Sequence, residues 1–265
     1  MLVRIAALGD LHSRGRPGEL SRRLAGIEQH ADVLLLCGDL TETGDPHEAR
    51  GLAQELAGIV VPKIAVLGNH DHERGAETEL EAILTGAGVQ LLDGTATTVG
   101  PLGIAGVKGF GGGFGRRRVA AFGEPATKRW VEEGRREAER LEAALRSLDT
   151  PHRVALLHYA PTLGTLAGEA PEIIPFLGSS DLAEACERAA ADAIFHGHCH
   201  FGKPQAKTER GIPVFNCAAP VLDHLRPPRR FVVVELSLSG TSERSVLPPP
   251  AEGWSPSPHP HRAET

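Results

Sequence analysis

Five short apolar runs, rich in Val, Ile and Leu, constrain the fold of this chain more than any other feature. They span residues 2–8, 33–37, 63–67, 154–157 and 192–195. Continuous apolar runs of this length are typical of strands that are buried on both faces. Segments of helical length, 19–30 and 46–58, separate the first three runs. The second segment is preceded by Asp45 as N-cap and begins with Pro46, which is a favoured first helical residue. This order predicts a βαβαβ unit and hence an α/β fold.

A polar motif follows each of these runs. The five motifs are Asp10-Leu11-His12, Gly38-Asp39, Gly68-Asn69-His70-Asp71, His158 and Gly197-His198-Cys199-His200. Ligands bind outside the carboxyl ends of parallel strands, so we expect the motifs to meet at one edge of the sheet. Residues two apart in an extended chain point to the same side, which pairs Asp10 with His12 and His198 with His200. Carboxylate, amide and imidazole groups without thiolates suit Mn, Fe or Zn in a non-structural site.

The residues next to the candidate ligands are expected to have structural roles. Gly38, Gly68 and Gly197 flank ligand positions, where the lack of a Cβ permits unusual backbone angles and close approach of a ligand. His196 shares a strand face with His198, and we expect it to pack behind the ligands rather than to bind metal. Cys199 is expected to be a small buried filler.

The ordered set D-x-H, G-D, G-N-H-D, H and G-H-x-H resembles that of the calcineurin-like metallophosphoesterase superfamily, in particular its bacterial phosphodiesterases. The resemblance implies a double β-sandwich flanked by α-helices over residues 1–240, with the metal site at the carboxyl ends of the strands. It implies two divalent metal ions, Mn, Fe or Zn. One would be held by Asp10, His12 and His200, the other by Asn69, His158 and His198, with Asp39 as the bridge.

The resemblance also implies the reaction, which is hydrolysis of a phosphoester. The substrate it favours is a phosphodiester, either a small molecule or a cyclic nucleotide. A hydroxide shared by the metals would attack phosphorus, because coordination lowers the pKa of water. His70 would protonate the departing alkoxide, and Asp71 would orient the His70 imidazole and favour its charged form. A phosphomonoesterase, a nuclease and a non-enzymatic metal-binding scaffold of the same fold remain as alternatives.

Two better-known branches of the superfamily differ from this chain. Purple acid phosphatases carry a tyrosine three residues beyond the bridging Asp, where this chain has Glu42, so a ferric tyrosinate centre is disfavoured. Protein serine/threonine phosphatases carry G-N-H-E, whereas Asp71 ends the motif here. Both activities are therefore unfavoured.

A glycine- and arginine-rich segment lies between the third motif and His158. Residues 109–126 are a candidate lid, and Arg116, Arg117 and Tyr159 are candidate substrate contacts. A solvated surface insertion is the alternative interpretation of this segment. Residues 127–148 carry apolar side chains at three- and four-residue steps, which predicts an amphipathic helix. We expect this helix to pack on its own sheet, with the seam of a homodimer as the alternative.

Composition restricts the partners and the location. A net charge of −6 disfavours binding to long nucleic acid. Four cysteines without C-x-x-C spacing predict reduced thiols and a cytoplasmic protein. Neither a signal peptide nor an apolar run of membrane-spanning length is expected. The proline-rich residues 248–265 are predicted to be a disordered tail.

Overall fold

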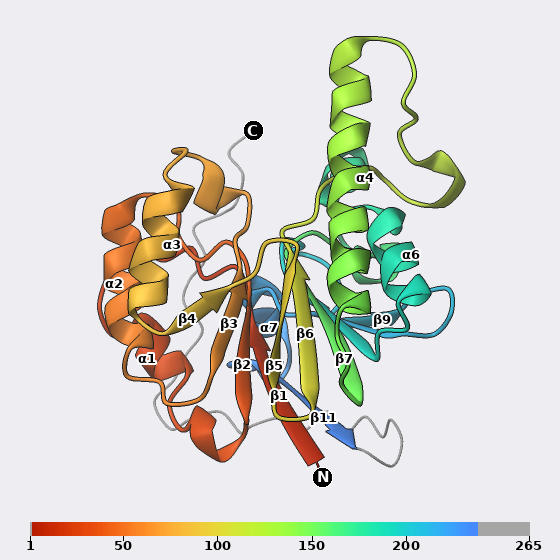
Figure 1. Cartoon of the computed structure of the whole chain (residues 1–265). Helices are drawn as coiled ribbons and strands as arrows, with labels where there is room; N and C mark the ends of the chain where they lie inside the picture. The colour runs from red at the N-terminus through yellow and green to blue at the C-terminus, as the bar shows by residue number, and fades with distance from the viewer. Residues whose placement is uncertain (1, 238–265) are drawn as a thin grey trace.

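The computed structural model describes residues 2–237 and contains two β-sheets that pack face to face between two layers of helices (Figure 1). The first sheet has the strand order β11-β1-β2-β3-β4. Its strands are β1 Leu2–Leu8, β2 Val33–Cys37, β3 Lys63–Val66, β4 Val89–Leu91 and β11 Val232–Ser237. β1 to β4 run parallel, and β11 is antiparallel to β1.

The second sheet has the order β5-β6-β7-β8-β10-β9. Its strands are β5 Thr95–Val99, β6 Leu102–Val107, β7 His152–Leu157, β8 Ala193–His196, β9 Gln205–Lys207 and β10 Pro213–Asn216. The four inner strands are parallel, and the edge strands β5 and β9 are antiparallel to their neighbours. Each sheet therefore presents the carboxyl ends of several parallel strands on one side.

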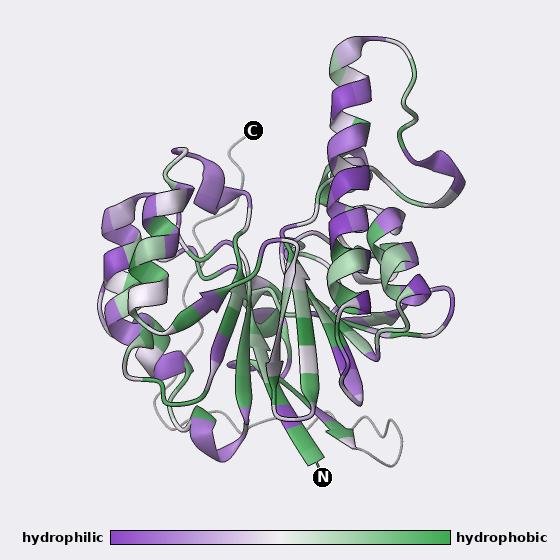
Figure 2. Ribbon diagram, in the orientation of Figure 1, coloured by the Kyte–Doolittle hydropathy of each residue, from purple (hydrophilic) through white to green (hydrophobic). Residues whose placement is uncertain are grey.

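Helices cover the outer faces of both sheets (Figure 1). On the first sheet lie α1 Glu19–Arg23, α2 Pro46–Leu56 and α3 Glu77–Gly86, and on the second lie α4 Pro125–Arg146 and α6 Ser180–Arg188. The short helices α5 Ile174–Leu177 and α7 Ala219–His224 lie in connections. Figure 2 shows apolar strands in the middle and polar outer helix faces. The predicted double β-sandwich flanked by helices is confirmed.

The main core lies between the sheets. It contains every residue of β2, and Ile104, Val154, Leu156 and Phe195 from the facing sheet. A second core joins the other face of that sheet to α4 and α6. Burial of this much apolar surface is the dominant favourable term in folding. It fixes the two sheets against each other and so sets the distance between the carboxyl ends of their parallel strands.

The local predictions are largely confirmed. Asp45 caps α2, its carboxylate accepting from the His47 amide, and Glu48 completes a capping box. The amphipathic helix α4 packs on its own sheet through residues such as Leu141 and Leu145. The prediction of one helix over 19–30 is wrong, because Gly26 adopts a left-handed φ of 72° between α1 and a 3₁₀ turn at Ile27–Gln29.

Two sequence predictions concern other parts of the chain. Among residues 2–237, no helix is both long enough and apolar enough to cross a membrane. The proline-rich segment 248–265 and the last residues of the predicted domain 1–240 lie outside the described residues.

Candidate metal centre

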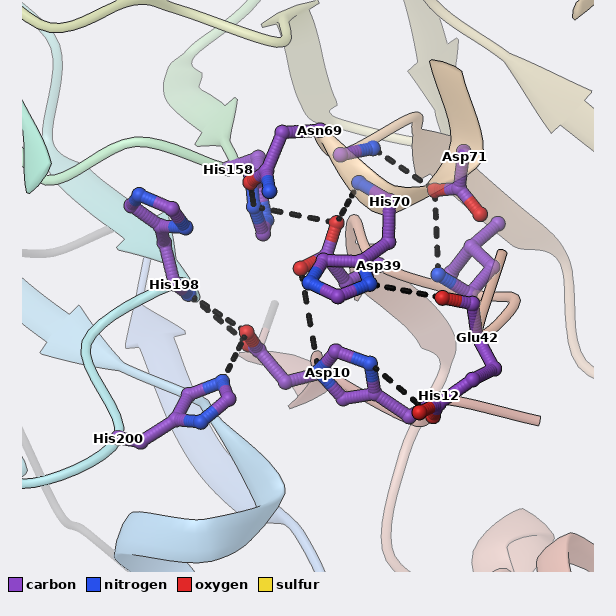
Figure 3. A network of polar contacts seen from close by, with 12 residues as sticks. Asp10, His12, Asp39, Glu42, Asn69, His70, Asp71, His158, His198 and His200 are labelled. Carbon is purple, nitrogen blue, oxygen red and sulfur yellow. Dashed lines mark hydrogen bonds and ion pairs between the residues drawn. The ribbon is translucent and has the colours of Figure 1, made fainter. Parts of the chain in front are cut away.

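All seven predicted metal ligands come together where the carboxyl ends of the two sheets face each other (Figure 3). β1, β2 and β3 supply one half of the group, and β7 and β8 supply the other. The halves are Asp10, His12, Asp39 and Asn69 from the first sheet, and His158, His198 and His200 from the second. The expectation of one sheet edge is therefore corrected, because the site spans the edges of two sheets.

The backbone is strained at the ligand positions. Asp10, His12, Asp39 and His198 have φ values of 54°, 44°, 48° and 68°. In residues 2–237 the one other non-glycine residue with positive φ is Ala190. A left-handed conformation costs a residue with a Cβ on the order of 1–2 kcal/mol. Strain of this kind persists where the surrounding structure enforces it, and it is concentrated at functional sites.

Three glycines make room for the ligands. A Cβ on Gly68 would lie 2.1 Å from Asp39 Oδ1, and one on Gly197 would lie 2.2 Å from Asp10 Oδ2. A Cβ on Gly38, whose φ is +81°, would lie 2.6 Å from the His158 ring. The predicted close approach of these glycines to ligand groups is confirmed.

We expect Gly68→Ala to lower both metal content and phosphoesterase activity by about a hundredfold or more, because its methyl group would displace the Asp39 carboxylate. Changes outside the ligand shell of metal sites already cost about 10- to 100-fold. Gly86→Ala in α3 is the matched control, since nothing lies within 4 Å of its added Cβ. Metal analysis after gel filtration checks both variants. Wild-type metal content in Gly68→Ala would contradict the expectation.

The first group of ligand atoms centres on Asp10. Asp10, His12 and His200 each offer an atom within 4.8 Å of the others. The His200 Nε2 lies 3.0 Å from Asp10 Oδ1. The backbone N–H of His198 donates to both Asp10 oxygens, at 2.9 and 3.0 Å, and so orients the carboxylate. One ion can be held between these three residues.

The second group centres on Asp39. Asp39, His158 and His198 again offer atoms within 4.8 Å of one another. The His158 Nε2 lies 3.4 Å from Asp39 Oδ1 and 2.9 Å from Asn69 Oδ1. His158 Nδ1 lies 2.9 Å from the Cys37 carbonyl, which leaves Nε2 facing the group. Asp39 Oδ2 lies 3.8 Å from His12 Nε2, so one carboxylate reaches both groups.

The electrostatics of the cluster fit divalent cations. Burial raises the pKa of Asp39 well above its usual value, and the nearby Asp10 carboxylate adds to this effect. Burial lowers the pKa of His12 and of His198 to about 4, and it lowers the pKa of His158 as well. Neutral imidazoles offer a lone pair, and buried carboxylates need compensating positive charge. This donor set therefore suits metal ions.

His70 lies beside the first group but is oriented by a different partner from the predicted one. Its Nδ1 lies 2.7 Å from the Glu42 backbone carbonyl, which can accept the ring N–H. Its ring lies edge-on to His12, with the centroids 4.6 Å apart. The His70 amide also donates to Asp39 Oδ1 at 2.9 Å. The ring is thus held at the metal centre with Nε2 available.

The prediction that Asp71 orients the His70 imidazole is wrong. Asp71 is fully buried and accepts hydrogen bonds from the amides of Leu40, Thr41 and Gly68 and from the Thr41 hydroxyl. The 3₁₀ turn at His70–His72 directs the two neighbouring side chains differently. Asp71 therefore ties the loops after β2 and β3 together, and it acts on the ligands through the backbone.

Sequence reasoning also missed the role of Glu42. Its carboxylate lies 3.6 Å from His12 Nδ1 and 3.1 Å from the Arg14 guanidinium. A carboxylate on the far nitrogen of a metal-ligating histidine orients the ring. The position of Glu42 three residues after Asp39 was the available signal.

The candidate substrate contacts separate into two places. The Tyr159 ring lies 4.4 Å from the His198 ring, at the metal centre. Arg116 and Arg117 are exposed in the turn Gly115–Arg117, which lies beyond α4 in Figure 1, away from the first sheet. The structure does not bring these arginines to the ligands.

The predicted lid is attached to the second half of the molecule. The Gly112 amide donates to the Pro175 carbonyl, and the Gly113 amide donates to the Gly178 carbonyl. Arg118 pairs with Asp181 and Glu184 of α6. A lid role for residues 109–126 stays a prediction.

His196 is buried against Thr165 rather than in either ligand group, at 3.0 Å from its Oγ1, and Cys199 is also buried.

The motifs and their convergence agree with an independent comparison. A family model described as calcineurin-like phosphoesterase matches residues 3–202. The chain belongs to this family. It is accordingly a metal-dependent phosphoesterase that acts on phosphoester substrates. A search of curated proteins finds no match.

Solved structures show the same fold at low sequence identity. A phosphopantetheinyl hydrolase from Mycobacterium tuberculosis is 18% identical with a TM-score of 0.58, covering 81% of this phosphoesterase and 88% of its own chain. A protein of Thermus thermophilus is 19% identical with a TM-score of 0.53, covering 88% and 94%. An anchor in the inner membrane complex of Plasmodium is 12% identical with a TM-score of 0.52, covering 89% and 81%.

The two ligand groups of the phosphoesterase predict separable metal defects. We expect His200→Ala to weaken the ion held with Asp10 first, and His198→Ala to weaken the ion held with Asp39 first, because each ring belongs mainly to one group. Calorimetric titration of the metal-free variants with Mn²⁺ resolves the two sites. Identical binding defects in the two variants would argue against this division of ligands.

Proposed function

We propose that this protein is a two-metal phosphodiesterase that acts on a small or cyclic-nucleotide diester. The observation that carries the proposal is the position of Asp39, whose oxygens lie 3.4 Å from His158 Nε2 and 3.8 Å from His12 Nε2. A single buried carboxylate between two ligand groups is suited to bridge two ions. Mn, Fe and Zn all fit these oxygen and nitrogen donors.

Each residue of the site has a proposed part in the reaction. When bound, two divalent cations would lower the pKa of water and stabilise charge on the phosphoryl oxygens. Asp10, His12 and His200 would hold one cation, and Asn69, His158 and His198 would hold the other. His70, held through Nδ1 by the Glu42 carbonyl, would donate a proton from Nε2 to the leaving oxygen.

The preference for a diester is supported by the resemblance of G-N-H-D to bacterial phosphodiesterases. A cytoplasmic location and a homodimer stay predictions. The scaffold alternative is the less favoured one, because the ligands of both groups and His70 are all present.

Hydrolysis of bis-p-nitrophenyl phosphate and of p-nitrophenyl phosphate by the manganese-loaded protein tests the proposal. We expect the diester to be hydrolysed with the higher kcat/KM, because a diester leaves one oxygen esterified and needs less charge neutralisation at the metals. Asp39→Asn is the blank for contaminating enzymes. A preference for the monoester would make a phosphomonoesterase the better assignment. Activity no greater than that of the blank would favour the scaffold.

A further inference from the structure

Four aromatic side chains come together beside the metal centre of a chain that has few of them. The whole sequence contains eight Phe, two Trp and one Tyr. Tyr159, Phe110, Trp130 and Phe176 form a continuous series, with successive ring centroids 6.0, 5.7 and 5.9 Å apart. We call these four residues the aromatic wall.

The inner end of the aromatic wall touches the proposed metal ligands. The Tyr159 centroid lies 4.4 Å from that of His198 and 5.5 Å from that of His158. Burial lowers the pKa of His198, and a hydrogen bond with the backbone of Phe176 opposes this shift, so the backbone of the segment that carries Phe176 lies beside the same imidazole. The aromatic wall is therefore within reach of a phosphoester held at these histidines.

The outer end of the aromatic wall is open to solvent. Phe176 is 61% exposed, and Phe110 and Trp130 are half-buried. The core rings Phe195 and Phe215, by contrast, are fully buried and stack on each other. Exposed apolar groups that cluster, rather than occur singly, mark binding surfaces. The aromatic wall therefore has the character of a binding surface.

Lys108 places an ammonium group at the inner edge of the aromatic wall. Its Nζ lies 5.0 Å from the Phe110 centroid and 5.2 Å from the Tyr159 centroid. Its carbonyl accepts from the amides of His158 and Tyr159, which fixes the residue at the rim. Within residues 2–237, the ammonium makes one hydrogen bond, to the Gly109 carbonyl, and no ion pair. An ammonium has three N–H donors, so two are available to a ligand.

The surroundings of Lys108 favour an anionic ligand. Burial lowers its pKa, and the carboxylates of Glu137 and Glu133 act in the opposite direction from a distance. A partly buried cation without a contacting carboxylate is costly by itself. Charge-assisted hydrogen bonds to a phosphoryl oxygen would offset that cost.

The glycine-rich segment lets the aromatic wall form. A Cβ on Gly111 would lie 2.9 Å from Trp130 Cζ2 and 2.8 Å from the Pro175 carbonyl oxygen. Only a glycine permits the indole to pack this closely on the backbone that carries Phe110. This packing gives the segment a role that the lid interpretation does not include.

We propose that the aromatic wall and Lys108 form the binding surface for the alcohol part of the substrate, and that this part carries a planar ring, as in a nucleotide. The inference rests on the proposed function and narrows its substrate class. The rings would stack on the planar group, and the ammonium would bind a phosphoryl oxygen. Any of the bases can stack strongly on an aromatic side chain. A flexible alkyl chain can bury apolar surface against the same rings, but it does not stack on them.

Binding of three phosphonates tests the inference apart from hydrolysis, because a C–P bond is not a substrate. The probes are the C–P analogue of adenosine 5′-monophosphate, methylphosphonate and pentylphosphonate, added to zinc-loaded protein. Trp254→Phe leaves Trp130 as the sole tryptophan. We expect the adenosine analogue to change Trp130 fluorescence and to bind at least about tenfold more tightly than either of the others.

Variants assign that affinity to the aromatic wall. Trp130→Leu and Lys108→Met are each expected to weaken binding of the adenosine analogue about tenfold in calorimetry. The matched controls are Phe122→Leu, an aromatic residue that is 82% exposed outside the wall, and Lys128→Met. Equal affinity for the three phosphonates would overturn the inference even if diesters are hydrolysed. Ring-dependent binding without any hydrolysis would support it and would contradict only the proposed function.

Discussion

Asp39→Asn is expected to weaken both metal sites by more than about a hundredfold and to reduce diester hydrolysis by at least about a thousandfold. Substitution of a residue that only hydrogen-bonds to a metal ligand lowers metal affinity or activity by about 10- to 100-fold. Asp39 would contact both ions directly, so a larger loss is expected. The substitution keeps the size of the side chain but removes a buried negative charge that faces His12 and His158. Metal analysis and steady-state kinetics with bis-p-nitrophenyl phosphate measure the two effects.

In the metal-free protein, by contrast, Asp39→Asn is expected to stabilise the fold. Burial raises the pKa of Asp39 above its unfolded value of about 4. A carboxyl with a raised folded pKa stabilises the fold below the unfolded pKa and loses that contribution as pH rises through the folded one. At neutral pH with a chelator, Asp39→Asn should therefore have the higher Tm. Asp32→Asn, which changes a surface carboxylate paired with Arg4, is the control for metal binding and should leave metal binding unchanged. A lower Tm for Asp39→Asn would count against this reasoning.

His70→Ala is expected to slow hydrolysis of alkyl diesters by about 10²- to 10⁴-fold, the usual contribution of a general acid. An alkoxide leaves poorly without a proton, whereas p-nitrophenoxide is stable as an anion and needs little assistance. The loss on bis-p-nitrophenyl phosphate should therefore be much smaller. Comparison of kcat for the two leaving groups gives the result directly.

The neighbouring His72 supplies the matched control for His70. It belongs to the same 3₁₀ turn, but its ring is exposed and pairs with Glu77 at 2.9 Å. His72→Ala should leave the ratio between the two substrates unchanged. Equal losses on both substrates in His70→Ala would remove the general-acid assignment and leave His70 as a structural neighbour of Asp39.

The strands and ligand motifs could be predicted because both depend on local sequence. β1 and β2 have the predicted bounds, since each is a continuous apolar run that ends at a polar motif. Asp10 and Asp39 then follow from position alone, because a residue just beyond a parallel strand lies at the rim. The origin of the motifs in two different sheets could not be predicted from local pattern, and the expectation of a single sheet edge was wrong for that reason.

The contacts that were missed depend on how separate segments meet. Glu42 and Lys108 are near the ligands because of the loop after β2 and the pairing of β6 with β7. Asp71 was assigned to its sequence neighbour, but its hydrogen bonds go to residues three and about thirty positions away. No short-range pattern encodes hydrogen bonds across about thirty positions, so the three-dimensional structure was needed to assign the partners of Asp71.

Because the proposed ligands come from two different sheets, bound ions would act as cross-links between the two halves of the fold. Asp10 and Asp39 follow strands of one sheet, and His158 and His198 follow strands of the other. Any ligand that binds only the folded state stabilises it, by about 2.7 kcal/mol at a hundred times its Kd. Cellular metal supply would then govern how much of this protein escapes proteolysis, so metal starvation would lower its abundance as well as its catalytic rate.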